Sequence, residues 1–128
     1  MRKYLRILSA VVMLLIKPAI AAEPSALQPQ TERCPLAPRP LPQSLQEAVD
    51  RITEKLDTKA RETLLNAKRD DLIRFHHGWG TGIRNSMCLW GGNESLLRSA
   101  CGGELCHPDD ASMKIMESVW DRLHTSKK

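Results

Sequence analysis

The four cysteines of this 128-residue chain limit what it can fold into more than any other feature. Cys34, Cys88, Cys101 and Cys106 all follow an apolar N-terminal segment. An even number of cysteines in a small exported domain is typical of disulfide bonds, whereas in a cytosolic domain such residues more often bind a metal or act in catalysis. The N-terminus therefore has to be considered first, because it indicates the compartment.

The N-terminus has the three parts of a secretory signal peptide. Residues 2–6 carry three cations, an apolar run extends over residues 5–16, and residues 19–21 fit the small-residue pattern that signal peptidase cleaves. Lys17-Pro18 ends the run before the roughly 20 residues that a membrane span requires. We therefore expect residues 1–22 to be a cleaved signal peptide and not a membrane anchor.

Removal of this segment changes the charge of the folded part. The chain has 19 Lys and Arg against 15 Asp and Glu, which gives a formal net charge of +4. Four of the cations lie in residues 1–22, which contain no acid, so 15 residues of each sign remain. A neutral domain with 4% aromatic residues lacks the basic stripe and the stacking rings that nucleic-acid binding needs. We expect neither a nucleic-acid partner nor a stable membrane anchor.

Export to an oxidising compartment favours disulfides over zinc at the four cysteines. Cys101 and Cys106 are the only close pair, whereas structural zinc sites usually combine two close pairs. Four cysteines allow three pairings. Among these we favour Cys101–Cys106 across the Gly102-Gly103 turn, together with Cys34–Cys88, which would tie the N-terminal segment to the centre of the fold.

Proline content divides the exported part in two. Six of the eight prolines lie in residues 23–43, which predicts an extended arm because proline interrupts both helices and sheets. Within this arm, Cys34 and Leu36 are the residues able to dock onto a fold. Residues 44–128 form the predicted helical domain.

Apolar residues recur at helical spacing in this domain, and no alternating run of β-branched residues predicts a strand. Ser44 and Glu47 form a capping box, and Asp57 and Pro108 are start signals for two later helices. Helical segments are expected near residues 45–56, 58–65, 72–77, 94–101 and 108–123, with a glycine-rich turn at 78–82 that enters a further short helix. The predicted fold is all-α, a small bundle of about five short helices stapled by disulfides.

Three segments are unusual for a plain helical scaffold. The first reads His-x-Gly-x-Gly-x-x-Ile-Arg-Asn from His76 to Asn85, the second is Leu89-Trp90, and the third is His-Pro-Asp-Asp-x-Ser from His107 to Ser112. Over residues 41–123 the chain resembles a family of small bacterial domains of unknown function. The resemblance supports the helical fold and implies no activity. The chain departs from the family pattern in its cysteines and at His77, where members tend to carry an aromatic residue.

The side chains of these segments include ligands suitable for zinc: His76, His77 and His107, with Asp109 or Asp110. Adjacent histidines on a helix point about 100° apart, so His76 and His77 cannot easily share one ion. The glycine-rich segment also lacks the Gly-Lys-Ser/Thr ending of a phosphate-binding loop. We therefore expect no metal and no cofactor.

A catalytic site is a further alternative. His76 or His107 would act as the base, Asp109 or Asp110 would orient it, and Ser112 would be the nucleophile. Ser112 follows the two acids so closely that we expect it in the first turn of the last helix, where an aspartate caps free N–H groups. This position does not favour a nucleophile.

A buried polar network is the interpretation that we favour for the same residues. Arg84 would pair with Asp109 or Asp110, while His76 and Asn85 satisfy loop carbonyls. Such charge-assisted bonds orient short helices whose apolar area alone does not specify their packing.

The three tryptophans have different expected environments. Trp120 belongs to the apolar stripe that the last helix forms with Met113, Met116, Val119 and Leu123, so it is expected in the core. Trp90 is expected to be half-buried. Trp79 stands between two glycines, and we expect it to be an exposed anchor that fills a pocket of a partner. The residues considered for partner binding are Trp79, His76, Arg84, Asn85, His107, Asp109 and Asp110.

These features favour an exported, non-enzymatic domain that binds another protein in the bacterial periplasm. The format is similar to that of small immunity proteins, which occlude a toxin delivered into that compartment. The alternatives are a periplasmic enzyme or metal-dependent factor using His76, His107 and Asp110, or a structural accessory protein of the envelope. Asn93-Glu94-Ser95 fits a glycosylation acceptor, which is incidental in a bacterium.

Overall fold

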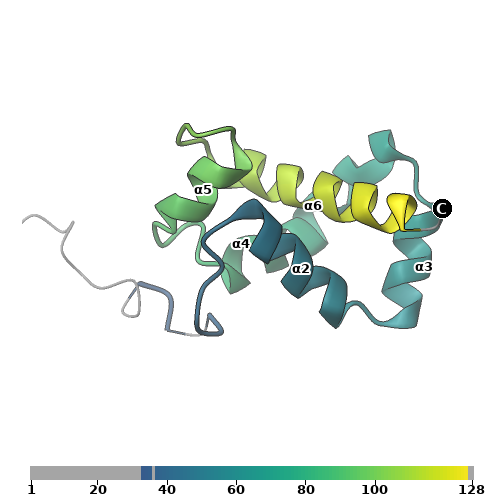
Figure 1. Ribbon diagram of the computed structural model, residues 1–128, viewed down its shortest axis with the longest axis horizontal. Helices are drawn as coiled ribbons and strands as arrows, with labels where there is room; N and C mark the ends of the chain where they lie inside the picture. The colour runs from purple at the N-terminus through teal and green to yellow at the C-terminus, as the bar shows by residue number, and fades with distance from the viewer. Residues whose placement is uncertain (1–32, 36, 127–128) are drawn as a thin grey trace, which may run out of the picture.

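A computed structural model describes residues 33–35 and 37–126, which form an all-α fold without a strand among them (Figure 1). Its elements are α2 (Leu45–Lys55), α3 (Thr58–Asn66), the 3₁₀ helix η2 (Arg69–Phe75), the π-helical turn η3 (His76–Gly80), α4 (Thr81–Ser86), α5 (Glu94–Ala100) and α6 (Pro108–Thr125). The predicted all-α bundle is confirmed. The expected signal peptide, residues 23–32 of the arm and Leu36 lie outside the described residues. No helix in the described part is long and apolar enough to span a membrane.

The last helix, α6, is the hub of the fold. Each of the other helices that the structure describes packs against it, with α2 alongside and α5 and α3 near its two ends (Figure 1). The buried residues of α6 are Ala111, Ser112, Ile115, Met116, Val119 and Leu123. Met116, Val119 and Leu123 belong to the predicted stripe, whereas Met113 and Trp120 are only partly buried at its edges. The indole of Trp120 donates to the carbonyl of Ala67 at 2.9 Å, which ties the end of α3 to α6.

The core has two parts along α6. One includes Ile83, Leu89, Leu96 and Ile115, and the other includes Val49, Leu64, Leu72, Val119 and Leu123. Phe75 and Trp79 pack against both parts. The segment from η2 to η3 therefore joins the two halves of the core.

The predicted helix starts at Ser44 and Asp57 are confirmed. The Ser44 hydroxyl accepts the Glu47 N–H at 3.2 Å, and the Glu47 carboxylate accepts the Gln43 N–H at 2.8 Å. The Asp57 carboxylate accepts the Ala60 N–H at 2.7 Å. The third helix differs from the segment expected at residues 72–77, because η2 begins at Arg69, without a side-chain cap, and Asp70 and Asp71 lie in its first turn.

The expected turn at residues 78–82 is absent, and the chain stays helical from η2 through η3 into α4. None of the three glycines there has a positive φ, so none of them is needed for a turn. Gly80 is buried, and a Cβ at this position would lie 3.1 Å from Nη1 of Arg84 and 3.4 Å from Cε of Met116. Its missing side chain lets η3 approach α6 closely and leaves room for the Arg84 guanidinium.

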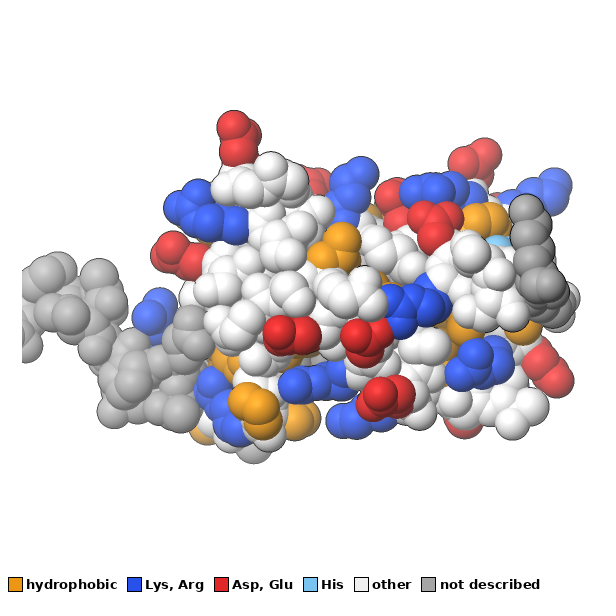
Figure 2. All heavy atoms as spheres, viewed as in Figure 1, with side chains coloured by type: hydrophobic (Ala, Val, Ile, Leu, Met, Phe, Trp, Pro, Cys, Tyr) orange, Lys and Arg blue, Asp and Glu red, His pale blue; other side chains and the backbone are white. Residues whose placement is uncertain are grey.

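Ion pairs connect α6 to its neighbours at the surface. Arg69 donates to Asp121 Oδ1 at 2.9 Å and to Glu117 Oε2 at 3.2 Å, and Arg122 pairs with Asp50 of α2. The hydrogen bond with Glu117 and the charge of Asp121 raise the pKa of Arg69. On the face shown in Figure 2, cations and acids are interspersed without a patch of one sign.

The two favoured disulfides, Cys34–Cys88 and Cys101–Cys106, are both present. The Cys101–Cys106 bridge closes the turn between α5 and α6. The Cys34–Cys88 bridge joins the arm to the loop after α4, and Ala37 and Leu41 of the arm are buried in the same small cluster as Cys88. The proline-rich arm is therefore docked through more residues than the sequence indicates.

Cys88 also ends α4. Its backbone is left-handed, with φ of 57°, and its N–H donates to the Asn85 carbonyl at 3.4 Å while the Leu89 N–H donates to Arg84 at 3.0 Å. This pair of bonds is a Schellman motif with cysteine in the position that glycine usually takes. Gly91 lies against the bridge, since a Cβ there would overlap both sulfur atoms.

We predict that Gly91→Ala destabilises the protein by about 1–3 kcal/mol, because the added methyl group overlaps a disulfide that cannot move aside. Chemical denaturation measures the loss. The matched control is Gly82→Ala in α4, where a Cβ meets nothing within 4 Å and alanine is the better helix former. Equal stability of the Gly91→Ala variant and the native chain would contradict this packing.

Asn93 joins three segments from a fully buried position. Its Nδ2 donates to the carbonyls of Pro42 in the arm at 2.9 Å and of Met87 at 3.0 Å. Its Oδ1 accepts the Leu96 N–H at 3.4 Å, which makes Asn93 the N-cap of α5. Because both amide hydrogens are used and the side chain is 0% exposed, the folded protein does not present Asn93 for glycosylation.

Replacement of Asn93 by Asp keeps the shape of the side chain but removes both donors. We expect a loss of roughly 2–4 kcal/mol, since a carboxylate would face two buried carbonyls without satisfying either, and a protonated carboxyl group could donate to one at most. Asn85→Asp is the control because that side chain is exposed, and it should change stability by less than about 0.5 kcal/mol. Urea denaturation of both variants separates the two cases, and similar losses would contradict the role of Asn93.

Candidate functional site

The first and third motif segments meet where η3 and α4 pack against the first turn of α6. Arg84 is at the centre and is 6% exposed. Its Nε lies 3.2 Å from Oδ1 of Asp109, and its Nη1 donates to the Ser112 hydroxyl at 2.9 Å. The remaining nitrogen, Nη2, donates to the Thr81 hydroxyl at 3.0 Å and to the His76 carbonyl at 3.4 Å. Each nitrogen of the buried cation thus has a partner, as a buried charge requires.

Asp109 is the shared anion of this network. Besides Arg84, it faces Nε2 of His76, which lies 3.6 Å from Oδ1. The Nδ1 of His107 accepts the Asp109 N–H at 3.3 Å, so His107 is the N-cap of α6. Neither aspartate caps the helix, although both lie in its first turn, where negative charge is favourable.

The structure brings some of the expected site residues together and leaves others apart. His76, Arg84, His107, Asp109 and Ser112 form one cluster. Asp110 is exposed and takes no part in the pairing that Asp109 makes, and Asn85 is exposed without a carbonyl to satisfy. His77 is exposed, with its ring edge-on to His76 at a centroid distance of 5.1 Å.

A hollow of about 420 Å³ lies beside this network and is lined in part by Arg84, Asn85, Cys88 and Trp90. Trp90 is 58% exposed, and its ring meets that of His107 edge-on at 5.1 Å. We call Asn85, Trp90 and His107 the Trp90 face. It is the solvent-exposed border of the Arg84 network, and all three residues come from the motif segments.

The span that matches a family model, residues 41–123, contains the Arg84 network and the Trp90 face. The model is that of a domain of unknown function, DUF6794. The chain belongs to the DUF6794 family. This confirms the resemblance that the motif segments indicate. The chain matches no curated protein and no solved structure.

Two tryptophans of this DUF6794 domain, Trp79 and Trp90, differ from their expected exposure to solvent. Trp79, expected at the surface, is half-buried and packs against both parts of the core. Trp90, expected to be half-buried, is the exposed one. The reason is that residues 76–86 form a helix instead of a turn, which directs Trp79 inward, while the disulfide-bonded loop carries Trp90 outward.

The geometry of the cluster does not support Ser112 as a nucleophile in this DUF6794 domain. Ser112 is 0% exposed, and its hydroxyl is engaged by Arg84 and by the Asp109 carbonyl at 2.9 Å, so it cannot reach a substrate. Asp110 does not join His76 and His107. Among the described residues, no group of three His, Cys, Asp or Glu side chains could hold a metal ion.

Removal of the central cation tests whether the network stabilises the fold. We expect Arg84→Ala to lower the free energy of unfolding by about 2–4 kcal/mol, because Asp109, Ser112 and Thr81 lose a shared partner. Asp109→Asn should also be destabilising, whereas Asp110→Asn in the same helical turn should cost less than about 1 kcal/mol. Guanidinium denaturation compares the three variants. If both aspartate variants have the same stability, the pairing of Arg84 with Asp109 is wrong.

Proposed function

We propose that this DUF6794 domain is an exported, periplasmic protein that acts by binding another protein and has no enzymatic activity. The observation that carries the proposal is the exposure of Trp90 beside the buried Arg84, whose guanidinium nitrogens all have partners. A large exposed aromatic side chain is a frequent anchor of protein interfaces. The neighbouring Asn85 and His107 add polar groups at its edge.

The loop that carries Trp90 is held in place before any partner arrives. The carbonyl of Cys88 accepts the N–H groups of Gly91 and Asn93, both at 3.1 Å, and the Cys34–Cys88 bridge fixes the start of the loop. An anchor that is already ordered loses little conformational entropy on binding. The loop therefore favours recognition by a rigid face.

Export is supported by the N-terminal signal pattern together with two disulfides, which persist in oxidising compartments. Small size, export and bridges are also the format of immunity proteins, and we propose this role: occlusion of a toxin delivered to the periplasm. A structural role in an envelope assembly is the alternative binding function. The enzymatic or metal-dependent alternative has less support, because Asp109, and not Asp110, is the acid that faces His76.

Site-specific photo-cross-linking in the producing bacterium tests for a partner. A photoreactive residue in place of Trp90 should give a defined cross-linked protein, whereas one in place of Ile73 in η2, which is equally exposed at 59%, should not. Cross-links from both positions, or from neither, would contradict a partner at the Trp90 face.

The immunity role has a separate test. If a cell-wall-degrading effector is encoded beside this gene, the domain should protect cells that receive the effector in the periplasm. Trp90→Ala should weaken the complex by about thirtyfold, as expected for an interface anchor, and Ile73→Ala should leave it unchanged. Calorimetry with the purified effector measures both. Binding without protection would favour an envelope role over immunity.

A further inference from the structure

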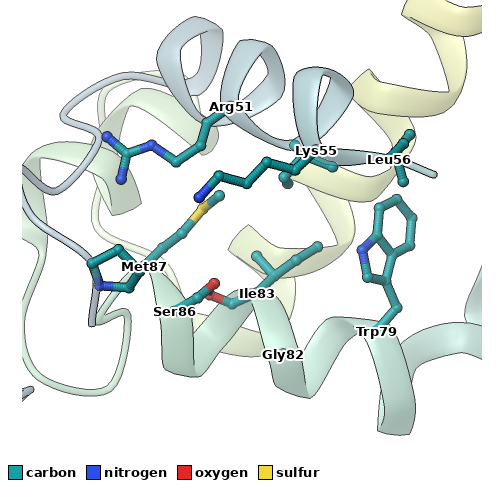
Figure 3. A pocket seen from close by; sticks show the side chains of 10 residues that line it. Arg51, Lys55, Leu56, Trp79, Gly82, Ile83, Ser86 and Met87 are labelled. Atoms are coloured by element: carbon teal, nitrogen blue, oxygen red, sulfur yellow. Dashed lines mark hydrogen bonds between the residues drawn. The ribbon is translucent and has the colours of Figure 1, made fainter. Parts of the chain in front are cut away.

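A second hollow, of about 280 Å³, lies on the other flank of α4 from the Trp90 face, between α4 and α2 (Figure 3). Gly82, Ile83 and Ser86 of α4 line it, whereas Arg84 and Asn85 line the hollow beside Trp90. The site is therefore distinct from the proposed protein-binding face.

The lining of this hollow is polarised along its length. Ile52, Ile83 and Met87 give the hollow an apolar lining. Met87 reaches toward the tip of Lys55, and Leu56 and Trp79 stand at the opposite end (Figure 3). At the other end the side chains of Arg51 and Lys55 reach across from α2, with the Ser86 hydroxyl on the opposite side (Figure 3). A polar, cationic end is thus joined to an apolar one.

The two cations have no acidic partner at this hollow. Arg51 donates to the carbonyl of Pro40 at 2.7 Å, which holds the guanidinium in place without neutralising it. No acid lines the hollow among the described residues, and Asp50, the preceding acid on α2, pairs with Arg122 instead. Two like charges spaced four residues apart on a helix repel each other, so an anion between them is favourable.

We propose that this hollow binds an amphiphile that has an anionic head and an aliphatic tail. The head group lies between Arg51 and Lys55, and the tail lies on Ile52, Ile83 and Met87 with its end at Trp79. The two cations favour an anionic head group by charge complementarity. The aliphatic lining favours an aliphatic tail, because burying it removes apolar surface from water. Because Trp79 and Leu56 stand across the apolar end, the hollow suits a single chain end better than the long apolar stripe of a helix.

Decanoate and decyltrimethylammonium have aliphatic tails of closely matched length and head groups of opposite charge, and they test the proposal below their micelle concentrations. The protein is purified with both disulfides intact, and binding is followed by the methyl NMR signals of Ile52, Ile83 and Met87. Decanoate should shift these signals saturably, and the ammonium compound should bind about tenfold more weakly. Decyl phosphate distinguishes a phosphate head group from a carboxylate, and tighter binding of either anion supports the proposal.

Charge reversal gives the matched variants. Lys55→Glu should weaken decanoate binding by about tenfold, while Lys59→Glu, at a cation that lines the neighbouring hollow, should leave it within about twofold. Equal binding of the two head groups, equal effects of the two variants, or no saturable shift of the three methyl signals would overturn the proposal. Binding of an acidic amphipathic peptide in place of both anions would overturn the ligand class. None of these outcomes depends on the Trp90 face.

Discussion

Burial of one face of α6 is the constraint on which the rest of the molecule depends. Each of the other helices in the described part packs against α6, and most of these helices are too short to be stable alone. Their conformation therefore depends on the apolar surface that α6 offers. This explains how a 3₁₀ helix, a π-helical turn and an α-helix follow one another without a break over residues 69–86: packing on α6 compensates for their irregular backbone hydrogen bonding.

The Arg84 network fixes the relative position of α4 and α6 within that packing. Apolar contacts hold helices together but allow them to slide or rotate, whereas the bonds from Arg84 to Asp109 and Ser112 require one register between α4 and α6. Gly80 belongs to the same arrangement, since its missing side chain provides the space for the guanidinium. The network thus places the Trp90 face and the polarised hollow on fixed flanks of a single short helix.

Features that depend on local chemistry could be predicted from the sequence. Ser44 and Asp57 start helices through bonds to residues three positions away, and periodicity identifies Met116, Val119 and Leu123 as buried. Features that depend on tertiary contacts could not. The glycines of residues 78–82 indicate a turn locally, but Gly80 is needed for the approach of α6. Packing between distant segments also decides that Arg84 pairs with Asp109 and not with Asp110. It likewise decides that Trp90 is exposed while Trp79 is half-buried.

The docking of the arm has a consequence for how this domain is delimited. The family match begins at residue 41, yet Cys88 inside the match is bonded to Cys34 outside it. A fragment cut at the family boundaries would keep Cys88 as a lone thiol with a left-handed backbone. Gly91 beside it would no longer contact the Cys34 sulfur. It would also lose Ala37 from the small cluster around Cys88. The family match is therefore shorter than the part of the chain that folds as a unit. A fragment made for expression should begin before Arg33.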